Sequence, residues 1–163
     1  LFIAFVSLLS CVVEKETEQT YLRWVGDIEH DFTVDGNDFK ICNKETNVRQ
    51  YFNMDEGLQI EGGKIRILRH FNEHYQAIEA NESGWIRVRF IVNCKGETGR
   101  FRMIEADENY QERPFDPRIS KQIFQFTESL NGWKPLEFNG RPVDYYQYLV
   151  FKIGNGKIEK IMP

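Results

Sequence analysis

The strongest constraint on the fold is an alternating segment between residues 84 and 92. Large apolar side chains occupy every second position of it: Ile86, Val88, Phe90 and Val92. Arg87 and Arg89 stand between them. Because successive side chains of a strand point to opposite faces, this pattern predicts a strand with one face against a core and a largely cationic face toward solvent. Turn residues at 94–97, followed by Phe101 and Met103, predict a second strand that pairs with the first as a hairpin.

Helical spacing on either side of this hairpin predicts two helices. Gly62 and Gly63 precede the first one, and its apolar residues are spaced by three or four positions: Ile65, Leu68, Phe71 and Tyr75. Asp116 followed by Pro117 is typical of a helix start, because Asp accepts from free backbone amides and Pro suits the first turn. The second apolar stripe follows with the same spacing: Ile119, Ile123, Phe126 and Leu130.

A long apolar segment from 143 to 153 predicts a further strand. The turn Asn155-Gly156 then directs residues 157–161 back as a hairpin partner of that strand. The order helix, hairpin, helix, strand predicts an α+β fold. Two helices pack on one face of a small antiparallel β-sheet in this arrangement.

The first eleven residues do not fit this pattern. Residues 1–10 form a short apolar run that ends in Leu8-Leu9-Ser10-Cys11, which is similar to a bacterial lipobox. We therefore expect part of a signal peptide at 1–10, a lipid-modified Cys11, and a charged tether over 11–20. The alternative is a buried N-terminal strand or helix. Residues 21–60 carry scattered apolar side chains and are assigned only as an N-terminal extension of uncertain structure.

The charge balance narrows the class of partner. The 163 residues include 21 Lys and Arg against 25 Asp and Glu, a net charge of −4, which disfavours nucleic acid because phosphate binding needs a cationic surface. The acidic residues after Cys11 are similar to the surface-export signals of Bacteroidetes lipoproteins: Glu14, Glu16 and Glu18. We expect an outer-membrane lipoprotein of the cell envelope, on its periplasmic face or on the cell surface, held by lipid alone.

Two cysteines remain once Cys11 is assigned to lipid attachment. Cys42 and Cys94 can pair in an oxidising compartment, where a bond between them closes a long loop. Two buried free thiols are an equal alternative.

The motifs between residues 61 and 163 resemble, in order and spacing, the C-terminal domain of the energy transducer TonB. The matching pieces are Gly62 through Tyr75, Gly84 through Val92, Lys95-Gly96, Phe115-Asp116, Gly132-Trp133-Lys134-Pro135 and Asn139-Gly140-Arg141-Pro142-Val143. The resemblance implies a non-catalytic binding domain without a cofactor. Domains of this family add an extended segment of an outer-membrane receptor to the edge of their sheet.

The resemblance assigns this role to the strand at 144–153. Its expected partner-binding residues are Tyr145, Tyr146, Gln147, Tyr148 and Val150, and Arg87 and Arg89 would add a cationic patch on the hairpin. Two features depart from a transducer: the chain has only five Pro for a spacer, and residues 157–161 can cover the binding strand themselves.

One motif points to different chemistry. His70, Glu73 and His74 match H-x-x-E-H, a pattern in which two His hold Zn²⁺ and Glu acts as a general base. The prediction for this short helix is nevertheless a solvated face without metal, and an enzyme is not expected. The leading hypothesis is thus an envelope lipoprotein that binds a protein or peptide by strand addition. The alternatives are a metal-dependent hydrolase built on this motif and a surface adhesin or glycan binder.

Overall fold

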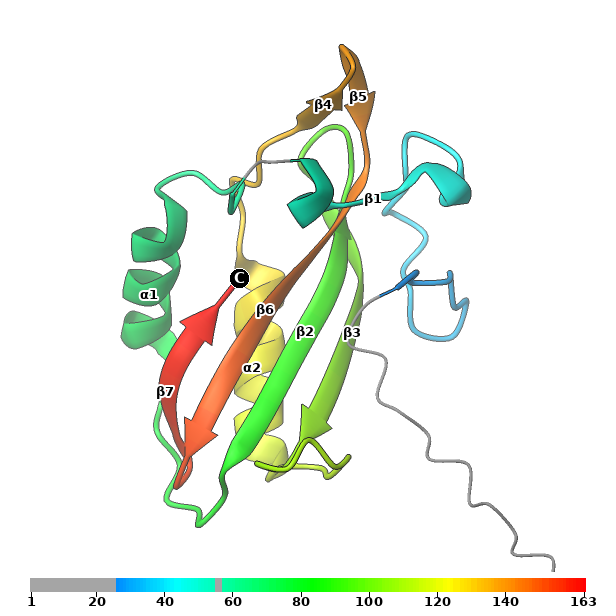
Figure 1. The fold of residues 1–163 in the computed structure, drawn as a ribbon. Helices are drawn as coiled ribbons and strands as arrows, with labels where there is room; N and C mark the ends of the chain where they lie inside the picture. The colour runs from blue at the N-terminus through cyan, green and yellow to red at the C-terminus, as the bar shows by residue number, and fades with distance from the viewer. Residues whose placement is uncertain (1–25, 55–56) are drawn as a thin grey trace, which may run out of the picture.

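The computed structural model describes residues 26–54 and 57–163 of the chain (Figure 1). The expected signal peptide at 1–10, Cys11 and the tether at 11–20 lie outside the described residues. The helices and strands are β1 (Arg49–Gln50), α1 (Gly63–His74), β2 (Gly84–Val92), β3 (Thr98–Ala106), α2 (Pro117–Ser129), β4 (Leu136–Phe138), β5 (Arg141–Val143), β6 (Tyr145–Gly154) and β7 (Lys157–Met162). Two short 3₁₀ helices flank β1, at Glu45–Asn47 and Tyr51–Met54.

A five-stranded sheet forms the centre of the fold. Its order is β1-β6-β2-β3, and β7 pairs with β6 on the same side as β1. β2, β3, β6 and β7 pair in antiparallel fashion, whereas β1 lies parallel to β6. β3 is the strand at the opposite edge, as Figure 1 shows. The predicted α+β class is confirmed.

Both helices contribute to one core on the apolar face of β2. The predicted alternation is confirmed, since Ile86, Val88, Phe90 and Val92 are all fully buried there. The stripe of α2 is confirmed as well, and its four buried members are Ile119, Ile123, Phe126 and Leu130. The Asp116 side chain accepts from the Arg118 amide at 2.8 Å and so caps this helix, as the sequence predicts.

The apolar stripe of α1 differs from the prediction. Ile67 and Phe71 are the buried residues, whereas Ile65 is 71% exposed and Leu68 is 36% exposed. Each helical residue turns about 100° around the axis, so Ile67 and Phe71 are about 40° apart while Ile65 lies about 160° from Ile67. The side of α1 that faces the core is therefore centred on Ile67 and Phe71.

The second face of the sheet is covered too, which the sequence did not predict. Residues 26–50 cross this face and place Ile28 against Ile91 and Tyr146 in a second apolar cluster. Phe39, Ile41 and Val48 pack around the same cluster and are partly buried. The N-terminal extension thus forms a cover over the face that was expected to be solvated and cationic. We refer to residues 26–50 as the N-terminal cover.

Two predicted turns have the backbone geometry that their sequences require. Asn139 and Gly140 have φ angles of 52° and 71°, and Asn155 and Gly156 have 50° and 73°. Two consecutive positive φ angles define the tight hairpin turn that Asn-Gly favours. The predicted return strand is confirmed, because β7 pairs with β6 from Val150 to Gly154. Within the described residues, we find no helix with the length and apolarity that crossing a membrane requires.

Candidate functional site

The residues expected to bind a partner on β6 are mostly buried. Tyr145, Tyr146 and Gln147 are between 0% and 3% exposed, and Tyr148 and Val150 are partly buried. Tyr145 belongs to the main core, whereas Tyr146 lies beneath the N-terminal cover. These side chains are therefore packing residues, and the sequence could not show this because it gave no indication of what covers them.

The backbone of β6 also has little free edge. β2 pairs with it along one side, from Tyr145 to Ile153. On the other side, β1 pairs at Tyr145 and Tyr146, and β7 pairs from Val150 onward. The position at which the resemblance places a foreign strand is thus largely filled by the chain itself.

The arginines of the expected cationic patch are held by groups of the same chain. The Arg87 guanidinium lies 3.7 Å from the centre of the Tyr148 ring, and its burial lowers the pKa of Arg87 to about 10. Arg89 donates to the carbonyl of Gly26 in the N-terminal cover. Both side chains are at most 7% exposed. This face does not present an open patch for a partner.

Two further arginines, on β3, join the sheet to the N-terminal cover. Arg100 binds the Glu45 carboxylate through two contacts of 2.7 Å, and Arg102 binds Asp35 in the same way. Hydrogen bonds from Arg100 and Arg102 lower the pKa values of Glu45 and Asp35, respectively. The charges of Arg100 and Arg102 are consequently neutralised by acidic residues of the N-terminal cover.

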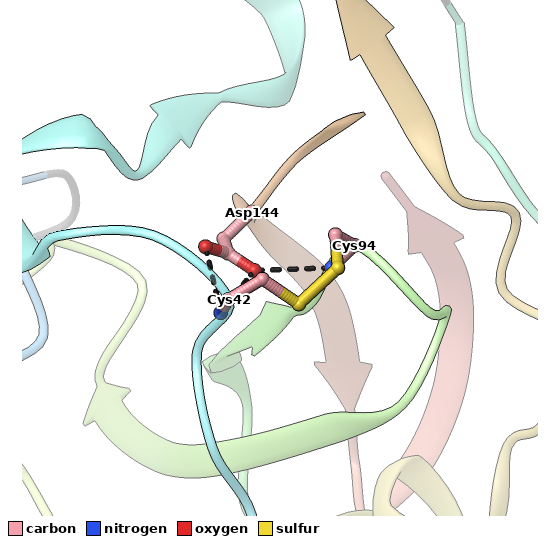
Figure 2. A group of neighbouring side chains, drawn as sticks. All are labelled: Cys42, Cys94 and Asp144. Carbon is pink, nitrogen blue, oxygen red and sulfur yellow. Dashed lines mark hydrogen bonds between the residues drawn. A yellow bond between two sulfur atoms is a disulfide. The ribbon is translucent and has the colours of Figure 1, made fainter. Parts of the chain in front are cut away.

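A disulfide and a buried carboxylate fasten the cover to the sheet. Cys42 and Cys94 are bonded, with their Cα atoms 6.0 Å apart. Beside them, the fully buried Asp144 accepts from the amides of Cys42, Asn43 and Cys94 at 2.8–3.1 Å, as Figure 2 shows for the two cysteines. The two sulfurs are bonded to each other, so this cluster is a structural fastening and not a metal site.

The open part of the sheet is the outer edge of β3. The Glu105 carbonyl accepts from the Arg113 amide at 3.2 Å on the side away from β2. Residues two apart in a strand point their backbone groups the same way, so the backbone amides and carbonyls of Phe101 and Met103 also point away from β2. Arg102 donates to the Phe101 carbonyl at 2.9 Å. Within the described part of the chain, this leaves Met103 as the residue whose backbone amide and carbonyl both point outward without a partner. We call these two groups the open pair.

A bulge shapes this edge next to the open pair. Arg89 pairs with Arg102 and Ile91 with Gly99, so Phe90 alone faces two residues of β3. Arg100, one of the two, has a φ of 55°. Such bulges bend a strand and end its regular pairing, and they are common beside binding sites. Here the bulge separates the open edge from the start of β3.

A groove of about 660 Å³ begins at the bulge. The start of β3, the loop at 30–39 and α2 form its walls. The aromatic side chains among its lining residues are Phe39, Phe101 and Phe124. Phe32 and Val34 in the loop are 89% and 67% exposed. The groove therefore combines an aromatic lining with an apolar loop at its rim.

The groove carries an excess of negative charge. Four acidic residues line it, namely Asp35, Asp38, Glu97 and Glu128. Asp35 is neutralised by Arg102, and the lining residue Arg100 is already bound to Glu45. Among the described residues, no cationic side chain forms an ion pair with Asp38, Glu97 or Glu128. Partial burial raises the pKa of Glu128, as expected for a carboxylate without a cationic partner.

The H-x-x-E-H motif lies at the end of α1, facing α2. His70 is partly buried, whereas Glu73 and His74 are exposed. One potential ligand atom from each of the three lies within 4.8 Å of the others. If Glu73 served as a metal ligand here, it would not be available as the general base that the hydrolase hypothesis assigns to it.

Sequence reasoning missed the β3 groove because its walls come from three distant segments. The alternation at 98–103 could indicate an edge strand, but no local pattern indicates that residues 30–39 and α2 flank it.

Comparisons with known proteins add no further identification, since no family model, curated protein or solved structure matches this chain.

Proposed function

We propose that the protein is a non-catalytic binding protein of the cell envelope that takes an extended peptide segment onto the outer edge of β3. The observation that carries this proposal is the open backbone pair of Met103 beside the acidic groove. Strand addition gives affinity through backbone hydrogen bonds and selectivity through side-chain pockets. The groove supplies the pocket, and Met103 supplies the backbone groups.

The charge and lining of the groove indicate the chemistry of the segment. Lys or Arg in the peptide would meet Asp38, Glu97 and Glu128, while an apolar or aromatic neighbour would contact Phe101 and Phe124. Charge complementarity of this kind favours encounter with cationic segments and disfavours acidic ones. The ligand class is therefore an extended segment of a protein with alternating cationic and apolar residues.

Selection from a random peptide library tests this proposal. We expect the enriched sequences to contain Lys or Arg beside apolar residues, and to shift the backbone amide resonance of Met103 when they bind. Enrichment of acidic peptides, binding that leaves β3 unperturbed, or failure to enrich any sequence would contradict the proposal.

Attachment to the envelope is the second part of the proposal. It is supported by the lipobox-like sequence ending at Cys11 and by the Cys42–Cys94 disulfide, since disulfides persist in oxidising compartments. Lipid on Cys11 would hold the binding domain at a membrane surface, where several acyl chains are needed for stable attachment.

A substitution at Cys11 tests the anchor separately. When the full-length protein is expressed in a Gram-negative bacterium, we expect it to enter the detergent phase of a Triton X-114 extraction. Cys11→Ser is expected to move it to the aqueous phase, because no acyl chains can be attached. Equal partitioning of the two proteins, or an unmodified Cys11 in the mass of the mature protein, would refute lipidation.

Binding of a cationic peptide should depend on pH through Glu128. Because partial burial raises its pKa, Glu128 takes up a proton at higher pH than an ordinary Glu, and affinity falls as pH decreases through that pKa. We expect Glu128→Gln to weaken binding about threefold at pH 7, the scale of a partly exposed ion pair, and to flatten the pH profile. Glu108→Gln, outside the groove, is the matched control. An unchanged profile in Glu128→Gln would exclude this role.

A further inference from the structure

The last turns of α1 bring two imidazoles and a carboxylate together. His70 and His74 are four residues apart and share one face of the helix, with ring centres 4.3 Å apart. One ligand atom from each of His70, Glu73 and His74 lies within 4.8 Å of the others. This site lies between α1 and α2, and it shares no lining residue with the groove at β3.

Hydrogen bonds define which nitrogen of each ring is left to bind a ligand. His74 Nδ1 lies 2.8 Å from the His70 carbonyl oxygen. A carbonyl oxygen only accepts, so Nδ1 of His74 carries hydrogen. In the neutral ring, the lone pair on Nε2 is then free.

The same reasoning applies to His70. Its Nε2 lies 3.3 Å from Ser129 Oγ, and Ser129 donates its hydroxyl hydrogen to the Phe126 carbonyl at 2.7 Å. Ser129 Oγ therefore accepts from His70 Nε2, which leaves the lone pair of His70 Nδ1 free in the neutral ring. Histidines that bind metals usually donate their other N–H to a carbonyl, carboxylate or similar acceptor, which fixes the tautomer and the ring orientation. Both imidazoles already have such an acceptor.

We propose that His70 and His74, with Glu73, bind a divalent transition metal of the Zn²⁺ or Cu²⁺ class. Two imidazoles and one carboxylate suit these ions, whereas Mg²⁺ and Ca²⁺ prefer sites made of oxygen ligands. Three protein ligands leave the fourth position of a tetrahedral ion open. His70 and His74 also line a space of about 340 Å³ together with Gln122 and Gln125 of α2. The sequence predicted a solvated face without metal. We revise that expectation because Ser129 of α2 and the His70 carbonyl accept hydrogen bonds from the two imidazoles.

Calorimetric titration with zinc sulfate tests the site, using the tag-free full-length chain with Cys11→Ser so that its thiol cannot compete. We expect one equivalent of Zn²⁺ to bind, and neither magnesium nor calcium chloride to give a signal. His70→Gln and His74→Gln are each expected to abolish stoichiometric binding. Ser129→Ala should weaken it about tenfold, the usual scale for losing a group that orients a ligand.

His30→Gln is the matched control, because His30 lies in the N-terminal cover and is the remaining histidine of the chain. It is expected to bind zinc as the parent protein does. Thermal unfolding without zinc verifies that each variant folds. Zinc should then raise the melting temperature of the parent and of His30→Gln equally, that of Ser129→Ala less, and that of His70→Gln or His74→Gln not at all. Absence of stoichiometric binding in the parent, or retained binding in both His70→Gln and His74→Gln, would overturn the proposal.

Discussion

Replacing both Cys42 and Cys94 with Ser is expected to lower the free energy of unfolding by about 4 kcal/mol. The bond joins residues separated by 52 positions, and a cross-link of that span strongly restricts the unfolded chain. A loss of this size is a large part of the 5–15 kcal/mol that stabilises an ordinary domain. The N-terminal cover would also lose the disulfide that fastens it to the sheet.

Urea unfolding of the oxidised parent and of the double variant measures this effect. Limited proteolysis gives a second readout, because we expect cleavage to increase first within residues 26–50. The reduced parent is the matched control, since it lacks the bond but keeps both cysteines, and it should unfold at the same urea concentration as the variant. A difference below about 1 kcal/mol in the free energy of unfolding between the oxidised parent and the variant would show that the disulfide contributes little to stability.

The second large effect is expected from Asp144→Asn. The buried carboxylate accepts from the amides of Cys42, Asn43 and Cys94, and from Asn43 Nδ2 at 3.0 Å. An Asn side chain has one acceptor oxygen and one NH₂ group, so at least one amide would face another donor. Leaving buried donors unpaired costs about 1–3 kcal/mol each, and we expect a total loss of about 3 kcal/mol.

Asp116→Asn is the matched control for Asp144→Asn. Asp116 caps α2 through the Arg118 amide, and Asn serves equally well as a helix cap. The substitution also removes the ion pair between Asp116 and the exposed Arg118 side chain, and such surface pairs contribute little to stability. Chemical denaturation should therefore separate the two variants clearly, with Asp116→Asn close to the parent. Equal stability of Asp144→Asn and the parent would mean that the carboxylate does not fasten the cover.

Much of the fold could be predicted because local patterns encode it. The alternation at Ile86–Val92, the stripe of α2 and the two Asn-Gly turns each depend on residues close in sequence. The stripe of α1 was correct at Phe71 but wrong at Ile65 and Leu68, because these two fit a helical spacing to Phe71 as well as Ile67 does. On a short helix with two apolar patterns, only packing against the sheet decides which one is buried.

The N-terminal cover could not be predicted, since long-range contacts hold it. Its segment has no helical or alternating period, and it is fastened by Cys94, Asp144 and the arginines of β3. For the same reason, the sequence could not indicate that the expected binding residues on β6 are covered. The groove at β3 required the positions of three separate segments, which only the fold supplies.

The most direct test of the proposed function compares Met103→Pro with Met103→Ala. Both variants remove a partly buried side chain, but only Pro also removes the outward amide, and edge strands tolerate Pro at such positions. The measurement is the affinity of the best peptide from the library selection, after thermal unfolding verifies that both variants are folded. We predict that Met103→Ala binds this peptide like the parent and that Met103→Pro loses at least about tenfold in affinity. That is the loss expected when one hydrogen bond between uncharged groups is removed and its acceptor is left unpaired. Equal affinities of the two variants would contradict strand addition at β3.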